Sequence, residues 1–262
     1  MDLFNDIGTA LAELDDLPRI GLSLLLIVVA GLVSRWQRAD LEKDLLISTV
    51  RGFIQLVAIG YVLEIVFDQD NPLWTALILG VMILIAARTS GQRGQKVPGA
   101  GWIALVSITF GAMSTLLVLV AAGVFDFTPE NIIPIGGMIV GNAMTICSQV
   151  MNRMADDLQD QRAQIEARLA LGASSREASL LQFRRALRGG MIPQIDTTKT
   201  VGLIKLPGAM TGMILAGASP LKAVQLQLIV MYMLVGATTF TGLSTAYLVY
   251  RVSFTAAHQL RG

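Results

Sequence analysis

Long apolar segments constrain this chain more than any other feature of its sequence. A helix that crosses a bilayer needs about 20 mostly apolar residues. The 262-residue sequence contains seven candidate segments on that scale, at residues 17–34, 45–67, 72–87, 101–123, 131–151, 197–217 and 223–250. The third is short, and Lys205, Pro207 and several glycines interrupt the sixth. Backbone groups must be satisfied internally in lipid, and no alternating strand pattern suggests a barrel. We therefore predict an all-α, polytopic membrane helical bundle.

Composition agrees with a membrane protein, since 53% of the residues are apolar and only 15% are charged. The net charge of +1 gives no basic face for nucleic acid. The single cysteine, Cys147, excludes a disulfide framework. The first 16 residues are acidic rather than basic, unlike a signal peptide, so we expect the first apolar segment to stay in the membrane.

The distribution of Lys and Arg predicts the orientation, because cytoplasmic loops are enriched in basic residues. Fifteen basic residues follow the first, third, fifth and last segments, whereas only Arg19 and Lys222 lie in the alternate connections. The N-terminus is therefore expected outside, and the C-terminus in the cytoplasm. Residues 152–190 become the only sizeable cytoplasmic segment of a single permease domain spanning 1–262.

The sequence of residues 152–190 predicts a helical elbow, that is, two helices joined by a turn. From Asn152 to Leu171 there is neither Pro nor Gly, so the fifth span is expected to continue into the cytoplasm as one long helix. Gly172 suits the left-handed position that ends a helix. Ser174 and Glu177 have the spacing of a capping box that starts a second helix, which we expect to run to about Leu187 and end at Gly189-Gly190.

Two interpretations of the elbow remain open from its residues. It can lie on the lipid surface as an amphipathic hairpin, with arginines near anionic headgroups; these are Arg184, Arg185 and Arg188. Alternatively, Glu166-Ala167-Arg168, followed three residues later by Gly172, is similar to the EAA motif of ABC-importer permeases. That motif forms the coupling helix that docks into the ATPase subunit. Arg168 departs from it, and the later Ile-x-Leu-Pro is missing at its usual spacing.

Longer stretches carry a wider resemblance. The chain resembles the iron-export ABC permease family of the FetB/YbbM type, which also includes plant aluminium-tolerance half-transporters. The matching stretches are LEKDLLISTVRGFIQLVAIGYVLEIVF (41–67), IIPIGGMIVGNAM (132–144), LALGAS (169–174), IPQIDTTKTVGLIKLPGAMTGMILAG (192–217) and PLKAVQLQLIV (220–230).

This resemblance implies a multi-pass permease of the bacterial plasma (inner) membrane, working as a homodimer with a separate ABC-type ATP-binding subunit. No Gly-x4-Gly-Lys-Ser/Thr loop is present. We therefore expect a transporter subunit rather than an enzyme, with ATP and Mg²⁺ bound by the partner. The expected ATPase-coupling residues are Glu166, Ala167, Leu171, Gly172, Ala173, Ser174 and Glu177.

Polar residues inside the spans are candidates for the translocation path, because ionisable groups in lipid usually face a bundle interior or water. Arg51 and Gln55 share one helix face, although Arg51 can also snorkel to the cytoplasmic interface. Glu64 is expected to reach the outer interface. Further candidates are Asn142, Met138, Met144 and Lys205.

Small residues predict close helix packing. Gly137 and Gly141 form a Gly-x3-Gly pair, which lets helices approach closely or permits a hinge. Pro207-Gly208 predicts a break in the sixth span. Asp196 and Lys199 have the spacing to pair on one helical face near the start of that span.

The metal ligands stay unknown at this level. Met138, Met144, Cys147 and Met151 fall near one side of the fifth span, but such soft ligands suit Cu(I) better than ferrous iron. Packing accounts for them equally well. The only histidine, His258, is interpreted as incidental. Iron export therefore rests on the resemblance alone.

Two alternatives to iron export remain. An ABC permease for a nucleotide sugar or another organic anion would differ in which cargo stimulates the ATPase. A transporter or membrane scaffold independent of any ATPase would purify without an ATP-binding partner.

Overall fold

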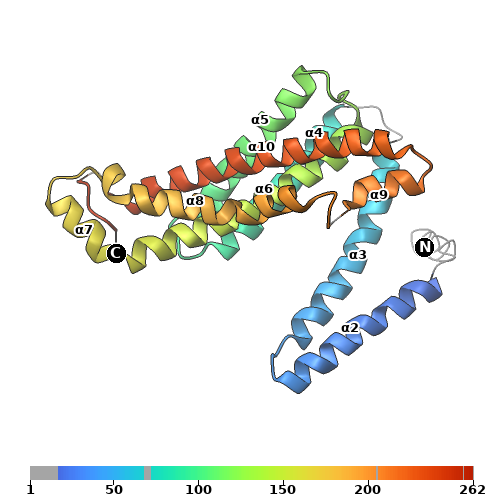
Figure 1. The fold of residues 1–262 in the computed structure, drawn as a ribbon, viewed down its shortest axis with the longest axis horizontal. Helices are drawn as coiled ribbons and strands as arrows, with labels where there is room; N and C mark the ends of the chain where they lie inside the picture. The colour runs from blue at the N-terminus through green and yellow to red at the C-terminus, as the bar shows by residue number, and fades with distance from the viewer. Residues whose placement is uncertain (1–16, 68–71, 205, 256, 262) are drawn as a thin grey trace. The chain divides into compact units, whose positions relative to one another are not determined.

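The structure is a computed structural model that describes residues 17–67, 72–204, 206–255 and 257–261. Within these ranges every named element is a helix (Figure 1). The chain divides into two compact units, Met1–Asp68 and Gln69–Gly262, and each unit is described by itself.

The first unit is a helical hairpin of α2 (Leu17–Gln37) and α3 (Glu42–Phe67). The turn between them places Arg38 and Asp40 at a φ of 55°, and the Leu41 N–H donates to Ser34 Oγ at 3.0 Å. Most large apolar side chains of both helices are exposed. Such a surface is suited to lipid or to another protein surface rather than to water.

The second unit is a helical bundle whose central layer is formed by four long helices. These are α4 (Pro72–Arg93), α5 (Ala100–Ala121), α6 (Pro129–Asp160) and α10 (Pro220–Ser253). Five of the six pairs among them pack together, the exception being α4 with α10. Their shared core is made of small and aliphatic residues, and Ala104, Ile108, Ile139, Ala143 and Ala237 are fully buried. Helices without large polar groups between them can approach closely enough for van der Waals packing to hold them in lipid.

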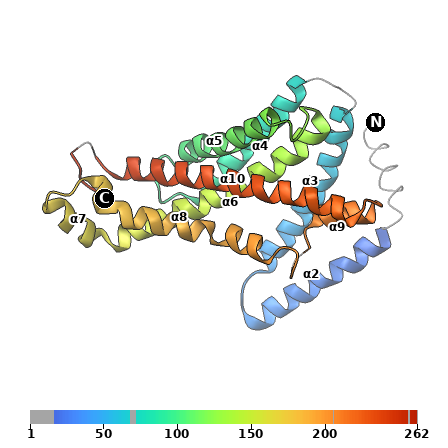
Figure 2. The same ribbon diagram turned by 45° about the horizontal axis from the view of Figure 1, so that its top comes forward.

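Three shorter or peripheral helices complete this unit: α7 (Arg162–Ala170), α8 (Ser175–Thr200) and α9 (Gly208–Leu215). Helix α8 packs along α6 and α10, and α9 packs on α10. Both ribbon views place α7 at one end of this unit and α9 at the other (Figures 1 and 2).

Close contacts at glycines set where these helices cross. A Cβ atom built on Gly111 of α5 would collide with the Thr241 hydroxyl of α10 and would lie 3.0 Å from the Ala237 carbonyl oxygen. On α8, a Cβ on Gly190 would lie 2.5 Å from Val150 Cγ2 of α6. Only a residue without a side chain fits at these two crossings.

The predicted helical membrane architecture is confirmed in its coarse form. Five helices are long and apolar enough to cross a membrane, namely α3, α4, α5, α6 and α10, and Gly21–Gln37 of α2 forms a shorter apolar helix. The sixth expected span, 197–217, is not one helix. Helix α8 ends at Thr200, residues 201–204 are non-helical, and α9 begins at Gly208 after Pro207 as its N-cap.

Two expected helix ends are wrong. The helix from the fifth span stops at Asp160 and restarts as α7, rather than continuing to Leu171. The second elbow helix continues through Gly189, Gly190 and Pro193 to Thr200, instead of ending near Leu187. The physical reason for the second error is tertiary packing, because Gly189 and Gly190 lie against Arg153 and Val150 of α6.

Replacing Gly111 with Ala is expected to destabilise the bundle by about 1–3 kcal/mol, because the new methyl group overpacks the α5–α10 crossing. The apparent unfolding temperature of the purified protein in detergent measures this loss. Gly101→Ala is the matched control on the same helix, since nothing lies within 4 Å of a Cβ there. Equal unfolding temperatures for the two variants would contradict the packing argument.

Candidate functional site

The elbow formed by the end of α6, α7 and the start of α8 is the candidate functional site. Its first bend is at Gln161, where φ is −106° and ψ is 21°. The second is a Schellman turn after α7: Gly172 has a φ of 89°, its N–H donates to the Leu169 carbonyl at 3.0 Å, and the Ala173 N–H donates to the Arg168 carbonyl at 3.1 Å. The predicted left-handed position of Gly172 is confirmed.

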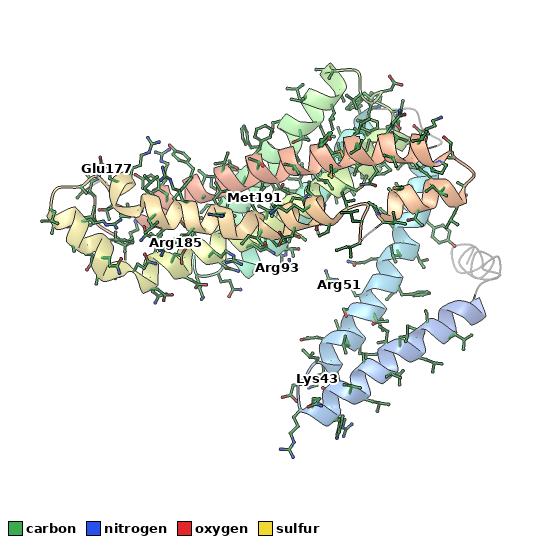
Figure 3. All side chains as sticks on the ribbon, viewed as in Figure 1. Lys43, Arg51, Arg93, Glu177, Arg185 and Met191 are labelled. Carbon is green, nitrogen blue, oxygen red and sulfur yellow. The ribbon has the colours of Figure 1, made fainter. Side chains whose placement is uncertain are left out.

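The predicted capping box at the start of α8 is also confirmed. The Glu177 N–H donates to Ser174 Oγ at 3.3 Å, and the Ser174 N–H donates to Glu177 Oε2 at 2.9 Å. The Ser174 backbone N–H and then its hydroxyl lower the pKa of the Glu177 carboxyl from its ordinary value. Figure 3 shows Glu177 at the turn between α7 and α8.

Contacts between the two arms fix the elbow. Ile165 of α7 and Ala178 of α8 are fully buried. The buried Gln182 side chain donates from Nε2 to Gln161 Oε1 at 2.7 Å, which ties α8 to the first bend. Arg168 Nη1 donates to the Ala178 carbonyl at 3.3 Å. The elbow is therefore held by buried apolar groups together with hydrogen bonds between its arms.

The expected coupling residues lie on the outer side of this elbow. Glu166 Oε1 accepts a hydrogen bond from Arg162 Nε at 2.8 Å, an ion pair that is about half exposed and adds little stability. Ala167 is exposed, and Ala173 is half-buried. Leu171 is 88% exposed at the tip of this turn.

The C-terminal segment forms a clamp on the elbow that sequence reasoning missed. An antiparallel bridge joins Phe254 to Leu260, and the Arg261 N–H donates to the Ser253 carbonyl at 2.9 Å. This fold-back places His258 Nδ1 at 2.6 Å from Ser175 Oγ and 3.5 Å from the Ser175 N–H. His258 therefore has a structural contact that the sequence did not predict, and its interpretation as incidental to metal binding stays a prediction. No spacing signal links residues 83 positions apart in the sequence.

The candidate path residues fall into separate parts of the chain. Arg51 and Gln55 are exposed on α3 in the first unit, where they line a groove with Leu46, Ile47, Val50 and Ile54. Asn142 lies on α6 in the second unit, and its side-chain amide donates to the Met138 carbonyl of its own helix at 2.8 Å. Met138 and Met144 are half-buried against the core. Lys205 lies outside the described residues.

The structure gives different surroundings to the remaining sequence candidates. A Cβ atom built on Gly137 would lie 3.1 Å from the Met82 side chain, whereas a Cβ atom on Gly141 would have no atom within 4 Å. Of these three glycines, Gly136 has the closest neighbour, because a Cβ atom there would collide with the Leu79 side chain. The packing role of the Gly137–Gly141 pair stays a prediction. Asp196 and Lys199 are both exposed, and the expected ion pair between them is not formed.

Hydroxyl groups are among the buried polar groups at the centre of the larger unit. Ser90 and Ser148 share a buried hydrogen bond of 3.0 Å between α4 and α6. Cys147 and Met151 are fully buried, and Met151 packs against Gly94. Over the described ranges, no three His, Cys, Asp or Glu side chains are grouped to hold a metal ion.

These features define a multi-pass helical membrane protein with a helical elbow at one end. The chain belongs to the uncharacterised protein family UPF0014, whose family model matches residues 17–254. The resemblance predicted from the sequence is thereby confirmed.

Named relatives cover nearly the whole chain. It is 44% identical over 260 residues to Protein ALUMINUM SENSITIVE 3 of Arabidopsis thaliana, covering 99% of this chain and 95% of the relative. It is 47% identical over 234 residues to the UPF0014 membrane protein STAR2 of Oryza sativa subsp. japonica, covering 89% and 82%. The probable iron export permease protein FetB of Escherichia coli K12 is 38% identical over 241 residues, covering 92% and 93%. No solved structure matches the chain.

Replacing Ser174 with Ala is expected to loosen the first turn of α8 by about 1 kcal/mol, because the Glu177 N–H loses its acceptor. Hydrogen exchange of residues 175–178 at pH 7 measures this change. Ser114→Ala is the control, since Ser114 Oγ donates only to carbonyls of its own helix. Unchanged exchange in the Ser174 variant would contradict the cap.

The stability of the capping box formed by Ser174 and Glu177 is expected to depend on pH. The folded pKa of Glu177 is lowered, so its stabilising effect is complete above the ordinary glutamate pKa of about 4.3 and is lost as the pH falls through the lower folded value. Exchange corrected for the intrinsic rate should therefore rise at residues 175–178 only below about pH 4. Glu177→Gln should abolish that pH step.

Replacing His258 with Ala is expected to release the C-terminal segment from the elbow. Amide exchange at residues 257–261 should rise several-fold, and exchange at Ser175 should rise with it. Gln259→Ala is the control, because it retains the backbone pairing with Thr255 and the His258 contact. If both variants loosen the segment equally, His258 does not hold it.

Proposed function

We propose that this chain is the membrane permease subunit of an ABC exporter, and that the elbow receives a separate ATP-binding subunit. One observation supports this most directly: the Glu-Ala-x-x-x-x-Gly order lies on a capped, internally tied turn with an exposed leucine at its tip. A docking element has to resist bending when its partner moves, and the Gln161–Gln182 and Arg168–Ala178 contacts meet that need.

The elbow is continuous with helices that run through the bundle. Helix α6 has 32 residues and therefore extends about 48 Å, while α8 has 26 residues and extends about 39 Å. A displacement at the ATPase would reach the bundle through both helices, because they are packed against each other along Gly189 and Gly190. The coupling residues in this proposal are those predicted from the sequence, with Leu171 as the central contact.

The remaining parts of the proposal extend the expectations drawn from the sequence resemblance. Two copies of the chain form a homodimer around a path in the bacterial inner membrane, with the elbow in the cytoplasm as the basic-residue bias requires. ATP and Mg²⁺ bind to the partner. The cargo is iron, supported by the similarity to the probable iron export permease protein FetB of Escherichia coli. Arg51, Gln55, Asn142 and Lys205 are proposed to contact it weakly, since a transporter must also release its cargo.

A pair of leucine variants tests the docking surface. Leu171→Asp is expected to reduce cargo-stimulated ATPase activity of the reconstituted complex at least tenfold, because a carboxylate cannot enter an apolar pocket without a large desolvation cost. Leu221→Asp is the matched control: Leu221 is 78% exposed at the start of α10, about 50 Å along that helix from the elbow end. Both variants should insert into the membrane.

The choice of cargo also distinguishes the alternatives. Ferrous iron is expected to stimulate the ATPase, whereas stimulation by nucleotide sugars alone would reassign the cargo and leave the ABC mechanism intact. Purification without any ATP-binding partner, together with full activity of Leu171→Asp, would overturn the proposal.

A further inference from the structure

A pocket between α8 and α10 lies near the elbow and is separate from the exposed turn assigned to the ATPase. It has a volume of about 330 Å³ and is lined by Arg176, Ser179, Leu180, Phe183, Tyr247 and Tyr250. Pockets of about 300 Å³ and above hold small ligands or parts of larger ones. The proposed coupling role does not use any of these six residues.

Aromatic rings form one wall of this pocket. The ring centroids of Tyr247 and Tyr250 are 6.4 Å apart, and those of Tyr250 and Phe254 are 5.6 Å apart, which makes a continuous series along the end of α10. Phe183 and Leu180 of α8 complete the apolar surface. Tyr247 is 51% exposed, so the pocket opens toward the surroundings of the bundle.

The rim of the pocket is positively charged. Arg176 lines it, and the Arg251 guanidinium lies over the Tyr247 ring at 6.0 Å from the centroid. No acidic residue lines the pocket. The nearest carboxylate along the chain, Glu177, is already bound to the Ser174 backbone and hydroxyl. One guanidinium group, that of Arg176, lines the pocket, and a second, that of Arg251, lies over the Tyr247 ring that forms part of its wall. The planar donors of arginine match the geometry of a phosphate.

We propose that this pocket binds an anionic phospholipid, with its phosphate at Arg176 and Arg251 and the upper part of its acyl chains along Phe183, Leu180 and Tyr247. The pocket lies where the apolar sequence of α10 ends in Tyr-Leu-Val-Tyr-Arg. Tyrosine side chains are typical of the membrane interface, and basic pockets between helices on the cytoplasmic side bind lipid headgroups. A soluble phosphate would not use the apolar wall.

A bound lipid would join the first turns of α8 to the end of α10. Ser179 Oγ donates to the Ser175 carbonyl at 2.7 Å, and Ser175 contacts His258, so the lipid site adjoins the clamp on the elbow. The membrane composition would thereby affect how firmly the elbow is held. This inference does not depend on the proposed ATPase partner.

Native mass spectrometry of the delipidated, full-length protein tests the site. Phosphatidylglycerol and phosphatidylcholine with identical acyl chains are titrated separately. We expect stronger binding of phosphatidylglycerol, and about a fivefold loss of affinity for it in Arg176→Gln and in Arg251→Gln, the effect of one basic group near an anionic lipid. Arg188→Gln is the matched control, since Arg188 is an exposed arginine of α8 that does not line the pocket.

A second measurement on the unmodified protein remains decisive if a variant fails to fold. A photoreactive phosphatidylglycerol is expected to label peptides containing residues 176–183 and 247–250. Equal binding of the two lipids, equal losses in the Arg188 control, or labelling elsewhere would overturn the proposal. Displacement of the lipid by glycerol 3-phosphate at an equal concentration would also overturn the proposal, because that result would show that the pocket binds soluble phosphates.

Discussion

Close packing around α6 is the interaction on which the larger helical unit depends. This helix contacts α4, α5, α8 and α10, and its residues Ile139, Ala143, Cys147, Val150 and Met151 are fully buried. In lipid, apolar side chains gain little from leaving the solvent, so helices associate by fitting their surfaces together. Small residues at the crossings provide that fit: Gly136 against Leu79 and Gly190 against Val150 allow the backbones to approach.

The same helix connects the apolar bundle to its polar end. Beyond the apolar sequence, α6 continues to Asp160, and α8 returns beside it, so the elbow rests on two helices rather than on a loop. Hydrogen bonds add to apolar packing at this polar end. They form the Schellman turn, the capping box, the Gln161–Gln182 contact and the His258–Ser175 contact. The geometry of the elbow is therefore determined by apolar packing and by hydrogen bonds together.

Local chemistry could be predicted from the sequence, and tertiary packing could not. Hydropathy located α3, α4, α5, α6 and α10, while Gly172, Ser174 and Glu177 predicted the second bend and its cap, because these signals act within a few residues. The course of α8 through Gly189 and Gly190 was missed, since glycine normally disfavours a helix and only contact with α6 explains its use there. The bend at Gln161 has no Gly or Pro signal. The clamp by His258 depends on a fold-back across 83 residues.

The segment between α8 and α9 depends on both local sequence chemistry and tertiary packing. Hydropathy assigns residues 197–217 to one span, yet the chain leaves the helix after Thr200 and turns through Gly202, whose φ is 83°. Leu203 and Ile204 beside that turn are 89% and 85% exposed. Lipid would accommodate these side chains, but it cannot satisfy backbone groups outside a helical hydrogen-bond series. Both requirements are met together if the turn lies against protein or a water-lined path, and that environment is what a second copy of the chain would supply in the proposed homodimer.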